Sequence, residues 1–232
     1  MQYNEYPYPE RVDSANFMSG VYGWMAFALS ITAGISYYIF KTQTLFKYLQ
    51  ATPGLIIGLF VLQFALVIAL AFFIKRMTLT MAIVAFVVYA VSVGITMASI
   101  FFVYTQSSIA TTFLVTAGMF GAMCLYGYFT KADLTAIGSF AIMGLFGLII
   151  GLLVNLFLRS SGFDYILSAF GVIIFTLLTA YDTQKIKRMA AQLVVDRETR
   201  GKVMIIGALT LYLDFLNLFL FMLHFVGGRR KN

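Results

Sequence analysis

The sequence predicts an all-α membrane protein in which seven helices cross the bilayer. Hydrophobic residues form 61% of the 232-residue chain and charged residues only 11%, which is typical of proteins that cross the membrane several times. Long stretches without Lys, Arg, Asp or Glu recur along the chain, and a transmembrane helix needs about 20 apolar residues. These stretches are residues 14–40, 48–74, 77–130, 134–158, 165–181 and 203–228, and only the last contains an exception, Asp214.

The N-terminal part of the chain is expected to divide into a mobile segment and two spans. Residues 1–19 are polar and rich in tyrosine, a composition that cannot bury a core. They lack the basic region of a cleaved signal peptide, so the apolar stretch that follows should remain in the protein as a first span over residues 20–40. Pro53 is a favourable first residue for a second span over residues 54–74.

The remaining spans follow from the charge-free stretches. The longest of these, residues 77–130, has room for two helices joined by a polar turn at residues 104–108. The last apolar run, residues 207–225, is the seventh span, and a basic tail of residues 229–232 follows it. Spans three to six are expected over residues 79–103, 109–129, 136–158 and 165–181. The transmembrane domain therefore covers residues 20–228.

A polar segment separates the sixth and seventh spans. From Ile186 onward, apolar residues recur at positions i, i+3, i+4, i+7 and i+8, while basic residues occupy the opposite face. This pattern predicts an interfacial amphipathic helix over about residues 184–198. Its basic face is expected to lie on anionic headgroups, and the alternative is that it forms a gate or a partner surface.

The distribution of basic residues predicts a cytoplasmic N-terminus. With seven spans, ten Lys and Arg residues lie on the N-terminal side of the membrane and six on the other, and the side richer in them is normally cytoplasmic. If the last segment were a re-entrant hairpin, the numbers would be thirteen and three. We prefer a full span, because the last stretch is long enough to cross.

Composition also argues against other classes of function. The net charge is +7, but the basic residues lie between membrane segments and do not gather on a soluble domain, so nucleic acid is not an expected partner. The expected partners are the lipid bilayer and another membrane protein. The single cysteine, Cys124, allows neither a disulfide nor a thiolate metal site within one chain. No cofactor is predicted.

Asp214 is the most informative residue of the sequence. It stands twelve residues after Lys202 and fifteen before Arg229, about 18 Å and 22 Å along a helix, and therefore near mid-bilayer. A carboxylate there costs about 2.5–3.5 kcal/mol, so such residues usually face a bundle interior and carry function. Thr210 and Asn217 lie on the same helical face, and this polar stripe should point inward. The alternative is a structural clamp between Asp214 and these two residues.

Four stretches of the chain resemble the bacterial branch of the transmembrane Bax-inhibitor-motif family. They are VYGWM, VYTQSSIATTFLVTAGMFGAMCLYGYFTKADL, GVIIFTLLTAYDTQKIK and GALTLYLDFLNLFL, in this order. The resemblance implies a seven-helix bundle in a bacterial cytoplasmic (inner) membrane, with the last helix surrounded by the other six. It also implies a pH-sensitive calcium leak with a sensor formed by Asp182 and Asp214 and a basic latch at Arg76. Gln63 stands near the place where some relatives carry a membrane glutamate.

The two aspartates suit a gate better than a tight metal site. Two carboxylates in a low-dielectric site do not readily both ionise, so the pair should titrate as a unit. A cation or Arg76 could replace the shared proton. Calcium prefers six to eight oxygen ligands, so Asp182 and Asp214 alone would bind it weakly, as a transported ion. Taken by itself, Asp182 could instead cap the amphipathic helix.

Two other functions remain open. The protein could be a non-transporting regulator that binds a membrane protease or another partner. It could also be an intramembrane aspartyl protease, because Tyr181 and Asp182 resemble the first motif of that class. The second motif is not matched, since LYLD lacks the glycines of GxGD, and we expect no enzymatic activity.

Contact between Asp182 and Asp214 sets a geometric requirement. It requires the last span to begin late or a vestibule to reach inward, because Asp182 is expected at the cytoplasmic interface.

Overall fold

The computed structural model describes residues 13–43, 45, 51–192, 196–228 and 230. Most of the segment predicted to be mobile and most of the basic tail therefore lie outside the described residues. Within them, seven helices are long and apolar enough to cross a membrane, as the sequence predicts. These are α1 (Ser14–Thr42), α3 (Pro53–Phe73), α4 (Leu79–Met97), α6 (Gln106–Phe129), α7 (Thr135–Leu158), α8 (Ser161–Gln192) and α9 (Arg197–Val226). Two short helical turns, η1 (Ile74–Arg76) and α5 (Ile100–Val103), complete the described elements.

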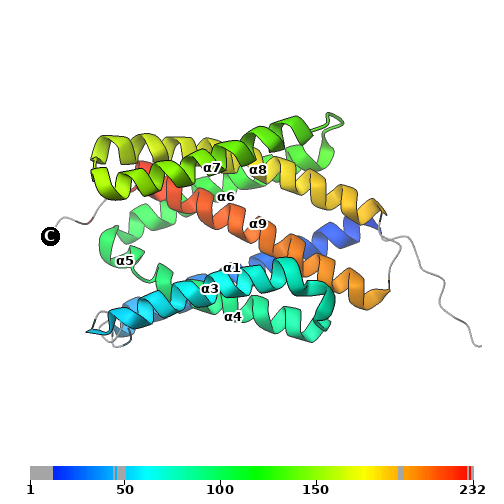
Figure 1. Cartoon of the computed structure of the whole chain (residues 1–232), viewed down its shortest axis with the longest axis horizontal. Coiled ribbons are helices and arrows are strands. Elements are labelled where there is room, and N and C mark those ends of the chain that lie inside the picture. The colour runs from blue at the N-terminus through cyan, green and yellow to red at the C-terminus, as the bar shows by residue number, and fades with distance from the viewer. Residues whose placement is uncertain (1–12, 44, 46–50, 193–195, 229, 231–232) are drawn as a thin grey trace, which may run out of the picture.

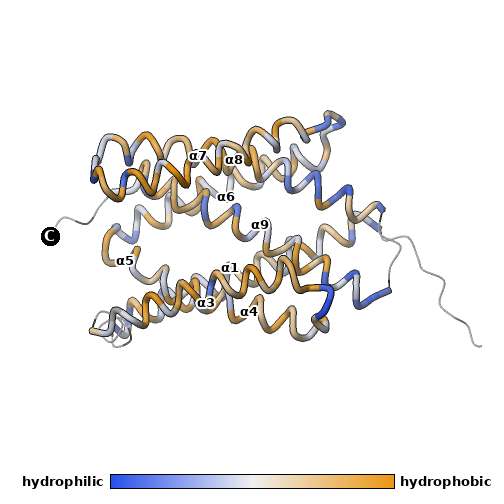
Figure 2. Tube along the Cα trace, in the orientation of Figure 1, coloured by the Kyte–Doolittle hydropathy of each residue, from blue (hydrophilic) through white to orange (hydrophobic). Residues whose placement is uncertain are grey.

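The last helix lies in the middle of the bundle, as expected. α9 runs diagonally between the group formed by α6, α7 and α8 and the group formed by α1, α3 and α4 (Figure 1). It packs directly on α1, α4, α6 and α8. The most apolar 18-residue stretch of α9 is 61% buried, whereas that of α3 is only 6% buried, because α3 packs mainly on α4 at the periphery. Hydrophilic residues concentrate at the two ends of the bundle (Figure 2).

α1 begins earlier than the sequence suggests. Its first residue is Ser14 and not residue 20, because the Asp13 side chain accepts a hydrogen bond from the Ala15 backbone N–H and caps the helix. Phe17 and Met18, which belong to the segment expected to be mobile, are buried in the core with 1% and 2% of their surface exposed. Residues 14–19 are therefore part of the bundle.

α8 is a single helix of 32 residues that includes most of the polar segment. The expected separate amphipathic helix over 184–198 is not present in the described part of this segment: residues 184–192 continue α8, residues 193–195 are not described, and α9 starts at Arg197. No glycine or proline occurs between residues 172 and 192 to end the helix. Ile186 and Ala190 pack into the core, with 2% and 0% of their surface exposed.

The polar face of this α8 extension binds the turn between α6 and α7. The Gln184 amide donates to the Ala132 carbonyl at 2.8 Å and accepts from the Leu134 N–H at 3.0 Å. The Lys187 ammonium donates to the Tyr128 carbonyl at 2.6 Å. Lys187, whose side chain the sequence assigned to lipid headgroups, thus binds a neighbouring helix end.

Asp133 adds an ion pair to this contact. Its carboxylate accepts hydrogen bonds from the Thr135 side chain and backbone and pairs with Arg188 at 2.9 Å. These bonds, those from Thr135 first, lower the pKa of Asp133 to about 2. Because both partners of the pair are largely exposed to solvent, we expect its contribution to stability to be small.

α9 is one uninterrupted helix of 30 residues, about 45 Å long. Asp196 caps its first turn by accepting from the N–H groups of Glu198 and Thr199. The two ends of α9 lie at opposite ends of the bundle (Figure 1). The last segment is therefore a full span and not a hairpin, which agrees with the preferred interpretation of the sequence.

A buried polar contact fixes the middle of α9. The Tyr212 hydroxyl, which is fully buried, lies 2.6 Å from the Thr32 hydroxyl of α1. Thr32 in turn donates to the Ala90 carbonyl of α4 at 3.0 Å. The backbones of α1 and α4 approach closely here, since a Cβ atom on Gly94 would lie only 3.0 Å from the Thr32 carbonyl oxygen. These contacts thus join α1, α4 and α9 at Tyr212, two residues before Asp214.

Candidate functional site

A cavity of about 560 Å³ lies between α7, α8 and α9. The wall contributed by α7 is entirely apolar, whereas α8 and α9 contribute polar side chains. The polar residues are Tyr181, Asp182 and Lys185 from α8 and Thr210, Asp214 and Asn217 from α9. The predicted polar stripe of the last span therefore faces a cavity inside the bundle.

The structure brings Asp182 and Asp214 together in this cavity. Asp214 is 5% exposed, and Asp182 is half-buried. The two carboxyls are within hydrogen-bonding reach of each other. Asp214 Oδ2 is buried and receives no hydrogen bond from any described residue. An ionised Asp182 cannot donate to this oxygen, because a carboxylate accepts hydrogen bonds and donates one only when it is protonated.

The length of α8 explains how the two residues meet. Asp182 lies ten residues before the last residue of α8, inside a continuous helix and not at the helix end that the sequence predicted. It therefore cannot cap a following helix, and that alternative is wrong. α8 and α9 are extensively packed against each other, which brings Asp182 to Asp214 without a late start of α9.

Thr210 and Asn217 do not clamp Asp214. The Thr210 hydroxyl donates to the Ile206 carbonyl at 3.1 Å, and the Asn217 amide donates to the Leu213 carbonyl at 2.8 Å. Both side chains thus bond to the preceding turn of their own helix. Both residues nevertheless line the cavity.

The basic residue of the site is Lys185, which the sequence argument did not single out. It lines the same cavity as the two aspartates, and its positive charge acts on the Asp182 carboxylate. Its ammonium lies 5.7 Å from the centre of the Tyr181 ring. The signal that could have identified it is the i, i+3 spacing from Asp182, which places both side chains on one face of a helix.

Arg76, the predicted latch, lies elsewhere in this structure. It ends η1, is exposed, and forms no ion pair with a carboxylate among the described residues. Gln63 also lies apart from the site, and its amide donates to the Thr96 hydroxyl of α4 at 3.3 Å. The latch therefore stays a prediction that needs η1 to move.

The cavity can accommodate a hydrated cation better than a dehydrated one. Within the part of the chain that the structure describes, no three His, Cys, Asp or Glu residues are grouped as metal ligands require. Two carboxylates and the side-chain oxygens of Thr210 and Asn217 fall short of the six to eight oxygens that calcium prefers. A calcium ion here would keep much of its water, so its binding would be weak.

A second polar cluster lies near the opposite end of α8. The His224 Nε2 atom of α9 lies 2.5 Å from the Asp164 carboxylate of α8. The other ring nitrogen is 3.3 Å from the Tyr104 hydroxyl, and the Asn155 amide donates to Asp164 at 3.4 Å. The cluster joins the ends of α5, α7, α8 and α9. His224 and Asp164 are 60 residues apart in the sequence, so no local pattern predicts this contact.

Comparison with known proteins places the chain in one family. The family described as "Inhibitor of apoptosis-promoting Bax1" matches residues 14–231. The inner membrane protein YbhL of Escherichia coli is 44% identical over 221 residues, which cover 95% of this chain and 94% of YbhL. A protein of Borreliella burgdorferi is 42% identical over 93% of both chains. The protein YrjE of Lactococcus lactis is 32% identical over 98% of this chain and 97% of its own length.

The match begins at the first residue of α1 and extends through all seven helices. Together with the seven apolar helices, the likeness to YbhL identifies a multi-pass protein of the inner membrane. The chain therefore belongs to the Bax-inhibitor (Inhibitor of apoptosis-promoting Bax1) family, which the sequence stretches around Asp182 and Asp214 resemble.

Proposed function

We propose that this protein is a pH-sensitive calcium leak channel gated by Asp182 and Asp214. The observation that carries the proposal is the buried pair itself, in which two carboxyls meet in a cavity and one oxygen of Asp214 has no hydrogen-bond donor among the described residues. Structural aspartates in membrane helices are normally paired with donors or bases, because an unpaired one is costly. A buried aspartate oxygen without a donor or base among the described residues can instead bind a mobile proton or cation.

Electrostatics gives the pair two alternative states. Two like charges about 4 Å apart repel by about 4 kcal/mol at an effective dielectric constant of about 20. One shared proton removes this repulsion and supplies the missing hydrogen bond, and a divalent cation removes it by charge. Lys185 lies at the same cavity and offsets one of the two negative charges. Proton, calcium and base thus compete for the same carboxyls.

The competition sets the sign of the pH response. When both carboxyls are ionised, a basic group holds them and the path is closed. Lys185 is the basic group nearest to the pair along α8, and Arg76 would join it if η1 moved toward the cavity. Protonation of one carboxyl weakens this hold, so flux should rise as the pH falls. At strongly acid pH a protonated carboxyl is a poorer cation ligand, so flux should decline again, which gives a maximum between the two regimes.

The test is calcium flux into liposomes that contain the purified protein, measured across pH. The variants Asp182→Asn and Asp214→Asn should each flatten the profile, because either removes the shared titration. Asp133→Asn is the matched control, since Asp133 is exposed and lies in the turn between α6 and α7. It should keep the parent profile. A maximum that persists in both site variants would mean that the sensor lies elsewhere.

The same liposomes and variants separate the other functions when peptide cleavage is measured beside flux. A regulator that binds a membrane protease or another partner without transport would show no flux in the parent above that of empty liposomes. An aspartyl protease would use the same two carboxyls, one as acid and one as base, so it would lose peptide cleavage in both variants. We propose a non-enzymatic role, because the cavity is built with a lysine beside the pair and its polar side chains suit a charged ion.

A further inference from the structure

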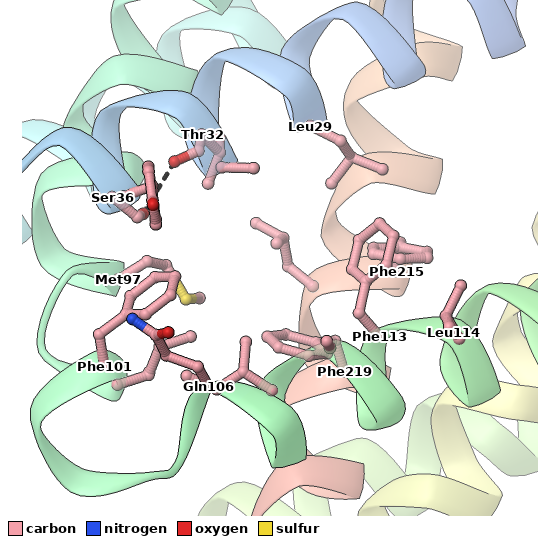
Figure 3. A pocket seen from close by; sticks show the side chains of 16 residues that line it. Leu29, Thr32, Ser36, Met97, Phe101, Gln106, Phe113, Leu114, Phe215 and Phe219 are labelled. Atoms are coloured by element: carbon pink, nitrogen blue, oxygen red, sulfur yellow. Dashed lines mark hydrogen bonds between the residues drawn. The ribbon is translucent and has the colours of Figure 1, made fainter. Parts of the chain in front are cut away.

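A second cavity, of about 510 Å³, lies on the other side of α9. α1, α5, α6 and α9 form its walls, together with the end of α4 (Figure 3). Apolar side chains dominate the lining, among them Leu29, Met97, Phe113, Phe215 and Phe219. The volume falls within the range of about 300–1,000 Å³ typical of small-molecule sites.

The two buried polar side chains in the walls, Thr32 and Ser36, leave little for water to bind. The Thr32 hydroxyl already bonds to the Ala90 carbonyl and to Tyr212, and the Ser36 hydroxyl donates to the carbonyls of Thr32 and Gly94. An enclosed water needs two to four polar partners. An apolar cavity of this kind is therefore not a stable place for water.

The cavity opens toward the bilayer between α1 and α6. Ala33 of α1 and Ala110 of α6 line it and are exposed, and Leu114 of α6 is 70% exposed. An empty space would forfeit the dispersion contacts of its lining. The abundant apolar molecule at this position in a membrane is the acyl chain of a lipid.

Two polar side chains close to the cavity suit a lipid phosphate. Lys41 is exposed at the end of α1, and its ammonium lies 5.5 Å from the centre of the ring of Tyr37, a cavity residue. Gln106 is exposed in the first turn of α6, and its side chain points toward the cavity (Figure 3). A positive charge and an amide thus lie beside an apolar groove, at the end of the bundle where a headgroup of the same leaflet would lie.

We propose that this cavity binds one acyl chain of a glycerophospholipid whose phosphate is held by Lys41 and Gln106. The lipid would support α9 from the side opposite the aspartate cavity. Phe215, Leu216 and Phe219 line the lipid cavity, whereas Asp214 faces the other one. The proposal depends on this geometry and not on ion transport.

Native mass spectrometry of the detergent-purified protein, titrated with dioleoyl phosphatidylglycerol, measures the binding directly. The parent should retain one lipid at low lipid concentration. Ala33→Phe and Ala110→Phe fill the cavity and should remove this adduct, whereas Ala65→Phe, on the exposed face of α3, should keep it. Lys41→Gln should weaken the binding about fivefold, as expected for one basic residue at an anionic headgroup. Dioleoylglycerol lacks the phosphate. It should bind the parent no more tightly than phosphatidylglycerol binds the Lys41→Gln variant.

A second measurement avoids variants that fill the core. The chain contains a single tryptophan, so Trp24→Phe combined with Phe113→Trp gives one reporter in the cavity wall. The control reporter is Phe64→Trp on α3, where Phe64 of the parent is 70% exposed. Brominated phosphatidylglycerol, present as a minor component of phosphatidylcholine vesicles, should quench the cavity reporter more strongly than this control. Equal quenching of the two reporters, or an unchanged adduct in both Ala33→Phe and Ala110→Phe, would overturn the proposal.

Discussion

Replacing Asp214 by Asn should stabilise the protein while it impairs the proposed gate. The carboxyl is 5% exposed, its Oδ2 atom has no donor among the described residues, and Asp182 interacts with it in the same cavity. Asn has nearly the same shape and carries an N–H donor that can bond to the Asp182 carboxylate. The substitution therefore removes a like-charge repulsion and adds a hydrogen bond. Functional sites often show such opposition between stability and activity.

Coulomb's law bounds the size of the effect. Repulsion between two charges about 4 Å apart is about 1 kcal/mol in water and about 4 kcal/mol at an effective dielectric constant of about 20. A gain of about 2 kcal/mol lies within these limits, because Lys185 lines the same cavity and offsets part of the charge. For a domain of this size, 1 kcal/mol corresponds to about 2–4 °C in Tm. Asp214→Asn should therefore raise the Tm by about 4–8 °C when both carboxyls of the parent are ionised.

Thermal unfolding in detergent, followed by circular dichroism from pH 5 to pH 9, tests this expectation. The gain should grow with pH, because a proton on the parent pair supplies at low pH the hydrogen bond that Asn supplies at all pH values. Asp133→Asn serves as the control and should give no gain, since it replaces the charged partner of an exposed ion pair. A Tm for Asp214→Asn that is equal to or below that of the parent at every pH would refute the reasoning that the two carboxyls share a proton.

Three further predictions concern charge. Arg76→Ala should raise the resting leak if the latch operates. Lys185→Gln should raise it more, because Lys185 already lines the aspartate cavity. Liposomes in which neither variant leaks more than the parent would argue against a basic latch. Ten of the sixteen basic residues lie on the N-terminal side, which is therefore expected to be cytoplasmic. Gln192→Cys should then resist an impermeant thiol reagent added outside intact cells, whereas a cysteine added after Asn232 should react. The reverse labelling pattern would show that the topology is inverted. The pKa of Asp133 is about 2, below its ordinary value of about 3.9. The stabilisation that the ionised Asp133 gives the folded protein is therefore present above about pH 4 and is lost as the pH falls toward 2. The difference in Tm between the parent and Asp133→Asn should disappear over that range, and a difference that persists at pH 2 would contradict this assignment.

The number and order of the helices could be predicted because the bilayer imposes a simple requirement. Each span needs about 20 apolar residues, so the charge-free stretches mark them directly. The ends of the helices were harder to predict, since they depend on local hydrogen bonds and on tertiary packing. Asp13 starts α1 at Ser14, and the contact of Gln184 with the turn between α6 and α7 stabilises α8 well beyond its apolar part. Neither interaction appears in a hydropathy pattern.

The aspartates could be singled out because a carboxylate among apolar residues is rare for energetic reasons. The cavity on the other side of α9 could not, since its lining residues come from α1, α4, α5, α6 and α9 and most of them are ordinary apolar residues. The same holds for the contact between His224 and Asp164, which are 60 residues apart in the sequence. Contacts between distant segments require the packing of the helices to be known.

The difference between Lys185 and Arg76 shows how a single helix boundary changes the interpretation of a site. When Asp182 is taken as the end of a span, Lys185 belongs to a separate amphipathic helix and its direction relative to the aspartates is undefined. In the continuous α8, the spacing of three residues places Asp182 and Lys185 on one face, and both line the cavity that contains Asp214. Arg76 ends a short helical turn after α3, which packs mainly on α4, so it can reach the carboxyls only if that end of the bundle rearranges. A base carried by the same helix as one aspartate needs no such movement, and the charge of Lys185 acts on Asp182 in the structure described here.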